Sequence, residues 1–296
     1  MSLSKRTAHV FPGQGAQFSG MGEDLYTQYS LARDLFAKAD EILGYSLSHT
    51  MFHGTDTELK QTKITQPAVF LHAYISYRCR AEELPDMVAG HSLGEFTALA
   101  VNQTLTFEDA LRLVRQRALA MQKACEKTES GMAVVLQFDH SKIEEICASI
   151  SDEIVVPANY NHPEQLVIAG SRRGLDKAVN LLQKAGARRI MMLPVGGAFH
   201  SPLMQSAQDE LASAIENCTF HTPICPIYQN VIGKSSQDIS EIKNNLLAQL
   251  THPVLWITSV QNMITAGATN FVEFGPGKTL QGLIKKINHE VMVSGR

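Results

Sequence analysis

The chain has 296 residues, of which 44% are hydrophobic and 19% charged, and its formal net charge is −3 at pH 7. This composition is ordinary for a globular enzyme, and it lacks the basic excess that non-specific nucleic-acid binding usually requires. No apolar run approaches the roughly 18 residues that span a bilayer, and five cysteines without a CxxC spacing suit a reducing compartment.

The first part of the chain alternates short apolar runs with helical patterns. A strand is predicted at residues 7–10, and a glycine-rich turn follows at 11–17. Helices are predicted at 31–43 and at 67–81, where Pro67 would occupy the first turn. A strand at 87–89, a helix start at 95–101 and a helix at 107–123 come next.

The middle of the chain has a different order of elements. Strands are predicted at 131–138, 154–158, 165–169 and 188–195, and helices at 141–149 and 175–185. This βαββαβ order is the ferredoxin-like arrangement and is complete in itself. We therefore expect an α/β protein in which residues 129–196 form a small inserted subdomain. Residues 1–128 and 197–296 would form the large one, with further strands at 226–228 and 271–274 and a helix at 279–288.

Ser92 lies in the hexapeptide GHSLGE at residues 90–95. The pattern Gly-x-Ser-x-Gly between a strand and a helix is typical of a nucleophile elbow, a sharp turn that exposes a serine hydroxyl. Glycines avoid side-chain crowding in such a turn. A glycine-rich turn with an incidental serine is the alternative interpretation.

A nucleophilic serine needs a base, and His200 is the best candidate among eleven histidines. His91 adjoins Ser92, but neighbours in an elbow do not point at each other. His200 lies on a glycine-rich turn where the chain re-enters the large subdomain, at the expected cleft between the two parts. A purely structural histidine remains the alternative at this position.

Five motifs occur in an order that resembles one enzyme family. They are FPGQG at 11–15, TQPA at 65–68, GHSLGE at 90–95, GAFHS at 197–201 and FGPG at 274–277. Together they span nearly the full length and resemble the malonyl-CoA:acyl-carrier-protein transacylases. The residues around the histidine are most similar to free-standing acyltransferases that serve polyketide synthases. The resemblance implies an α/β-hydrolase-like large subdomain beside the ferredoxin-like one.

The resemblance also implies a mechanism through an acyl-serine. Ser92 would attack the malonyl thioester while His200 takes its proton. The backbone N–H groups of Gln14 and Leu93 would form the oxyanion hole. The main-chain carbonyl of Gln249 would orient the imidazole, so the pair is a Ser-His dyad.

Three residues are implied in substrate binding. The family's carboxylate-binding arginine matches Arg117, whose guanidinium suits a malonyl carboxylate, although a solvated helix arginine is the alternative from the residues alone. The following residue is commonly glycine in the family and is Ala118 here. Phe199 would fill the space that the branch of methylmalonyl needs, and Gln66 would line the same pocket.

The implied partners are malonyl-CoA and an acidic acyl carrier protein that docks transiently. Arg188, Arg189, Lys285 and Lys286 are candidate docking charges. We expect neither a cofactor nor a metal. We expect a cytoplasmic monomer that binds neither nucleic acid nor a membrane. Two alternatives remain: an acyl-carrier-protein hydrolase of the same fold, and a non-catalytic docking module of a synthase complex.

Overall fold

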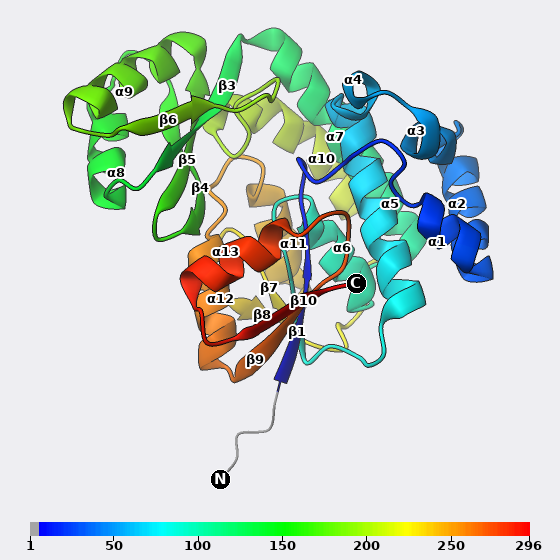
Figure 1. Cartoon of the computed structure of the whole chain (residues 1–296). Coiled ribbons are helices and arrows are strands. Elements are labelled where there is room, and N and C mark those ends of the chain that lie inside the picture. Colours follow the sequence, from blue (N-terminus) through cyan, green and yellow to red (C-terminus); the bar gives the residue numbers. More distant parts are fainter. Residues whose placement is uncertain (1–5) are drawn as a thin grey trace.

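A computed structural model describes residues 6–296, which fold around two separate sheets (Figure 1). The larger sheet has the strand order β10-β9-β1-β2-β7-β8, and every neighbouring pair is parallel except β7 and β8. Its strands are β1 (Arg6–Phe11), β2 (Met87–Gly90), β7 (Ile227–Tyr228), β8 (Ser235–Ser236), β9 (Ala268–Glu273) and β10 (Met292–Gly295). Residues 1–5 of the expected large subdomain lie outside the described residues.

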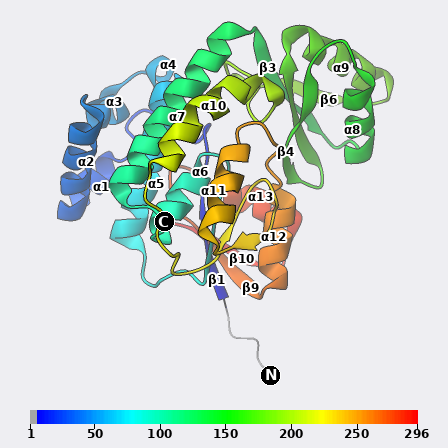
Figure 2. The same cartoon turned by 180° about the vertical axis from the view of Figure 1, so that it is seen from behind.

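The core lies on both faces of this sheet, because successive residues of a strand point to opposite sides. Phe11 and Val88 belong to one apolar cluster, and their neighbours Val10 and Ala89 belong to another. The first cluster contains α5 (Thr62–Arg80), α6 (Gly94–Val101) and α7 (Phe107–Lys127). The second contains residues of α12 (Trp256–Thr265) and α13 (Thr279–Ile287). In Figure 2 these two helices lie on the opposite side of β1 from α5 and α7. The central strands β1 and β2 are therefore buried apart from Arg6, as in other doubly covered parallel sheets.

The smaller sheet is antiparallel and has the order β4-β5-β3-β6. Its first and third strands in sequence are central, as the ferredoxin-like arrangement requires. Two helices pack on one face of this sheet and close a third apolar cluster. The elements are β3 (Ser130–Leu136), α8 (His140–Ser149), β4 (Val155–His162), β5 (Gln165–Ser171), α9 (Arg172–Lys184) and β6 (Arg189–Met192). In Figure 1 this unit stands to one side of the large sheet.

The α/β fold class is confirmed, and several predicted boundaries are wrong. The helix predicted at 67–81 begins at Thr62, so Pro67 lies inside α5. The missing N–H of Pro67 removes the donor for the carbonyl of Lys63, and Lys63 is exposed, so water can replace that donor. The strand predicted at 154–158 continues to His162 because it pairs with β5 along this length. The strand predicted at 188–195 is shorter, since β6 pairs only along four residues of β3.

Several helices carry no signal that we recognised in the sequence. They are α1 (Glu23–Gln28), α3 (Leu47–His53), α4 (Asp56–Leu59), α10 (Gln205–Glu216), α11 (Ile239–Ala248), α12 and the 3-10 turn η1 (Pro202–Met204). Helix α2 (Ser30–Leu43) matches its predicted range closely. Among residues 6–296, no helix combines the length and apolarity that crossing a membrane would require.

Candidate active site

Ser92 occupies a sharp turn between β2 and α6, with a φ of 53°. A Cβ on Gly94 would stand 2.0 Å from the carbonyl oxygen of Phe11, and one on Gly90 would stand 1.8 Å from the carbonyl carbon of Gly94. Only glycine fits at either position because the helix starts directly against β1. The turn therefore holds Ser92 in a left-handed conformation that residues other than glycine rarely adopt. This is the geometry of a nucleophile elbow.

Ser92 and His200 are in direct contact. Ser92 Oγ lies 2.8 Å from His200 Nε2, and His200 Nδ1 lies 2.8 Å from the backbone carbonyl of Gln249. A carbonyl can only accept, so Nδ1 carries the proton and Nε2 accepts from the serine hydroxyl. Burial, assisted by the positive charge of Arg117, lowers the pKa of His200 to about 3. The imidazole is therefore neutral at pH 7 and able to take a proton.

Two backbone N–H groups are available beside this pair. Gln14 follows β1 and Leu93 precedes α6, and β1 and β2 are adjacent parallel strands whose last residues, Phe11 and Gly90, are in register. The turns after both strands therefore meet at the same edge of the sheet. Within residues 6–296, neither the N–H of Gln14 nor that of Leu93 donates a hydrogen bond. Two unpaired donors, one of them at the start of α6, suit a developing oxyanion.

Arg117 is buried, at 1% exposure, on the face of α7 that points toward Ser92. Its Nη1 donates to Gln66 Oε1 at 2.6 Å, and its Nη2 donates to Gln249 Oε1 at 3.0 Å and to Ser92 Oγ at 3.1 Å. Its Nε–H is buried and finds no acceptor in the described part of the chain. Burial lowers the pKa of Arg117 to about 10, which leaves the guanidinium charged at pH 7.

A cavity of about 490 Å³ joins these groups to the small sheet. Ser92, Arg117, Phe199 and His200 line it from the large unit, together with Gln14. From the small unit and its connections come Met132, Asn159, Asn161, Gln165, Val167, Leu193, Pro194 and Val195. The cavity thus lies at the junction of the two units, where His200 was expected.

Gln66 is not among the residues that line the cavity, and His91 is not placed as the base. Gln66 is fully buried behind Arg117, which it contacts, and its amide nitrogen lies 3.3 Å from the sulfur of Met121. His91 lines the cavity, but its Nε2 is 2.8 Å from Asn161 Oδ1, and its ring meets Trp256 edge-on. His91 therefore connects the elbow to the small sheet.

Three polar side chains beneath the elbow were not found from the sequence. Asn230 accepts from the N–H of Ser92 at 2.7 Å and donates to the carbonyl of Gly90 at 2.6 Å. Glu95 is fully buried and accepts from Gln229 Nε2 and from the N–H of Asn230. Gln229 and Asn230 directly follow β7, the neighbour of β2. Their position at the carboxyl edge of the sheet is the sequence signal that could have identified them as site residues.

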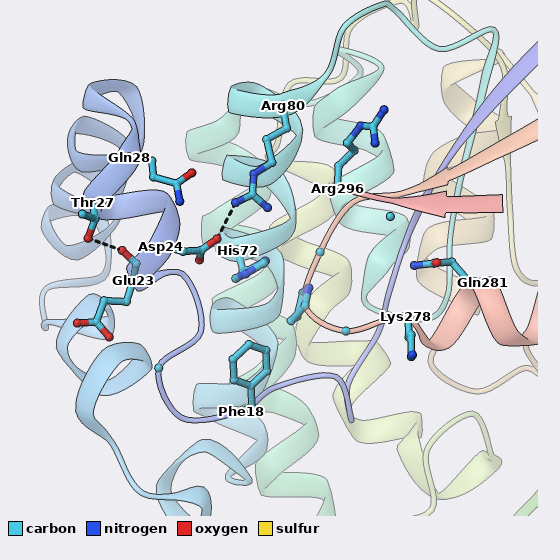
Figure 3. Close-up of a pocket in the computed structure, with 15 residues that line it drawn as sticks. Phe18, Glu23, Asp24, Thr27, Gln28, His72, Arg80, Lys278, Gln281 and Arg296 are labelled. Atoms are coloured by element: carbon cyan, nitrogen blue, oxygen red, sulfur yellow. Dashed lines mark hydrogen bonds and ion pairs between the residues drawn. The ribbon is translucent and has the colours of Figure 1, made fainter.

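A second, larger depression of about 910 Å³ lies elsewhere, between α1, α5 and the loop before α13 (Figure 3). Its wall includes the ion pair of Asp24 and Arg80, at 2.6 Å, and the ring of His72. It contains neither Ser92 nor His200, so the larger hollow is not the site of the serine chemistry. Among residues 6–296, no group of three or more His, Cys, Asp or Glu side chains could hold a metal ion.

Known proteins match this chain over nearly its whole length. Residues 8–293 match the family model described as an acyl transferase domain. A malonyl CoA-acyl carrier protein transacylase of Staphylococcus aureus is 39% identical over 291 residues, covering 98% of this chain and 94% of the relative.

Solved structures agree closely in shape. The transacylase of Streptococcus pneumoniae has a TM-score of 0.94 at 39% identity, covering 98% of this chain and 96% of that one. A malonyl-transacylase solved in complex with its type II polyketide synthase acyl-carrier protein has a TM-score of 0.95 at 35% identity, covering 99% and 96%. The chain therefore belongs to the malonyl CoA-acyl carrier protein transacylase family.

Proposed function

We propose that this protein moves a malonyl group from malonyl-CoA to the phosphopantetheine thiol of an acyl carrier protein, through an ester on Ser92. The observation that carries the proposal is the contact of a buried arginine with a dyad serine. Arg117 Nη2 lies 3.1 Å from Ser92 Oγ, and His200 Nε2 lies 2.8 Å from the same oxygen. A malonyl carboxylate stands one methylene beyond its thioester carbonyl, so a guanidinium beside the nucleophile can reach it.

Acylation begins when Ser92 Oγ attacks the thioester carbon while His200 Nε2 takes the hydroxyl proton. The negative charge that develops on the carbonyl oxygen is stabilised by the N–H groups of Gln14 and Leu93. The tetrahedral intermediate then collapses, the C–S bond breaks, and His200 returns the proton to the leaving thiolate. The Gln249 carbonyl holds the imidazole in the tautomer that this sequence needs.

Transfer to the carrier protein repeats these steps in reverse with a different thiol. The incoming phosphopantetheine thiol gives its proton to His200, attacks the malonyl ester and releases Ser92. Because CoA and a holo carrier protein share the same arm, one cavity serves both steps. The solved complex of a related malonyl-transacylase with its acyl-carrier protein supports such a partner.

The exposed arginines Arg188 and Arg189 at the start of β6 are the better docking candidates for an acidic carrier protein. The ammonium group of Lys285 already donates to the carbonyls of His289 and Val291, just after α13. Lys286 lies 3.9 Å from Glu164, an exposed pair of small energetic value. We therefore assign carrier docking mainly to the arginine pair.

No cofactor is needed, because the serine, the base and the backbone donors supply the chemistry. A carrier-protein pathway of fatty-acid or polyketide synthesis in the cytoplasm suits this activity. We propose residues 129–196 as the small subdomain, with 1–128 and 197–296 as the large one, so that the cavity lies between them.

The decisive experiment follows the malonyl group by mass. Incubation with malonyl-CoA should add one malonyl mass to the intact protein, and a holo carrier protein should then remove it. Ser92→Ala should carry no adduct, whereas the exposed Ser149→Ala in α8 should be labelled normally. An adduct that persists in Ser92→Ala would refute the assignment of the nucleophile.

The same experiment separates the two alternatives. A carrier-protein hydrolase would lose the malonyl group to water at the same rate with and without a carrier thiol. A docking module would form no adduct at all. The buried Arg117 argues against the hydrolase, since its guanidinium suits a substrate with a carboxylate. The contact of Ser92 with His200, beside the free N–H of Gln14, argues against the docking module.

A further inference from the structure

Glu95 is a buried carboxylate to which the mechanism above gives no role. It is fully buried in the first turn of α6, three residues after Ser92. Its Oε1 accepts from Gln229 Nε2 at 3.0 Å, and its Oε2 accepts from the N–H of Asn230 at 2.9 Å and from Gln249 Nε2 at 3.1 Å. All three partners are donors, and a site of donors alone is built for the ionised carboxylate.

The amide of Gln249 lies between this carboxylate and Arg117. Its Nε2 donates to Glu95 Oε2, and its Oε1 accepts from Arg117 Nη2 at 3.0 Å. This orientation of the amide is fixed, because a carboxylate only accepts and a guanidinium only donates. Within residues 6–296, no carboxylate pairs directly with Arg117, so Glu95 is its nearest compensating charge, one amide away.

We infer that Glu95 is the internal counter-ion of Arg117, and that it competes with the malonyl carboxylate for the guanidinium and so limits how strongly the enzyme favours malonyl over acetyl. This inference rests on the proposed function. A buried cation with no anion nearby would be costly in the empty enzyme, and Glu95 offsets that cost. When malonyl binds, two carboxylates face one guanidinium, which disfavours the ionised form of Glu95. Malonyl binding is then accompanied by proton uptake at Glu95.

A weaker hold on the malonyl carboxylate has a use in this reaction. The acyl group must leave Ser92 for a second thiol, so an arginine with no competing charge would retain the malonyl ester too tightly. Glu95 acts through Gln249 and Arg117 and touches no substrate, so it is a positioning residue. The network also holds the elbow, since Gln249 Nε2 donates to the carbonyl of Ser92 at 3.0 Å.

The competition predicts a dependence of selectivity on pH. Burial raises the pKa of Glu95 to about 7, against the opposing effects of its three hydrogen bonds and the charge of Arg117. The other titratable groups at this network are His200, whose pKa is lowered to about 3, and Arg117, whose pKa is lowered to about 10. The neighbours from the β7–β8 connection and from the end of α11 are neutral amides. Glu95 is therefore the group that changes charge between about pH 6 and pH 8.

Only the ionised form of Glu95 competes with malonyl for Arg117. Below pH 7 Glu95 is largely protonated, Arg117 is left for malonyl, and selectivity is high. Above pH 7 it is ionised and selectivity falls. If bound malonyl raises the pKa of Glu95 by about one unit, reciprocal linkage lowers the preference for malonyl roughly fivefold from about pH 6 to pH 8. The malonyl carboxyl titrates near pH ~4, outside this range.

The test is a competition between malonyl-CoA and acetyl-CoA for acylation of Ser92, read by mass at several pH values. Both donors carry CoA, so titration of its phosphates cancels in the ratio. The wild-type ratio should fall roughly fivefold from about pH 6 to pH 8. Glu95→Gln should keep a high ratio without a slope, and Arg117→Ala should show a low ratio without a slope.

Glu273→Gln is the matched control. Glu273 is also a buried glutamate with a raised pKa, caused by burial, but its carboxylate accepts from the N–H groups of Leu280 and Gln281 at the start of α13. It should retain the wild-type slope. A wild-type ratio that does not change with pH, or the same slope in Glu95→Gln, would overturn the inference. If no malonyl adduct forms on wild-type Ser92, the proposed function itself fails, which is a separate result.

Discussion

Arg117 offers the sharpest test of substrate selection, because it is neither the nucleophile nor the base, and its contact with Ser92 Oγ affects acylation by both thioesters. Its Nη1 is held by Gln66 and its Nη2 by Gln249, so a malonyl carboxylate gains mainly the unpaired Nε–H or the Nη2 edge that faces Ser92. One charged hydrogen bond contributes about 1.5–3 kcal/mol. Arg117→Ala should therefore lower the malonyl-to-acetyl ratio of kcat/KM by about 10-fold to 150-fold.

The assay compares acylation by the two CoA thioesters in one mixture, so any general loss of folded enzyme cancels. Arg117→Lys should give an intermediate ratio, since an ammonium keeps the charge but cannot bridge Gln66, Gln249 and the acyl group together. Arg115→Ala, an exposed arginine on the same helix, should leave the ratio unchanged. A ratio in Arg117→Ala equal to that of the wild type would remove Arg117 from substrate selection.

Three further outcomes are expected. The rate of acylation by acetyl-CoA should stay flat from about pH 8 to pH 5. Burial lowers the pKa of His200 to about 3, so the imidazole loses its basic form only as the pH falls toward that value. A tenfold loss of rate by about pH 5.5 would indicate a histidine with an unperturbed pKa. Gly94→Ala should lower Tm and abolish acylation, since its Cβ would stand 2.0 Å from the Phe11 carbonyl oxygen; a variant with normal Tm and rate would contradict the tight elbow. Phe199→Ala should raise the use of methylmalonyl-CoA relative to malonyl-CoA in the same competition, because the ring lines the acyl cavity; an unchanged ratio would mean that the ring does not exclude the branch.

Much of the fold could be predicted because its signals are local. The hydrophobic spacing of α7 and the strand and turn before α6 are written in consecutive residues. The βαββαβ order of the small sheet is likewise a pattern along the chain. Errors arose where neighbours in space set the limits, as in β4, which extends to His162 because β5 continues beside it. Pro67 was expected at a helix start, but packing of α5 in the core overrides that local preference.

The sequence by itself determined which residues could do chemistry: a serine in an elbow motif, a histidine on a glycine-rich turn, and an arginine at a family position. Only the tertiary structure decided that these groups meet, because Ser92, His200 and Gln249 come from segments more than forty residues apart in the chain. It also placed Glu95 and Asn230 beneath the elbow, where burial gives them their effect. A carboxylate in a sequence carries no sign of its surroundings, and the surroundings of Glu95 make it a partner of Arg117.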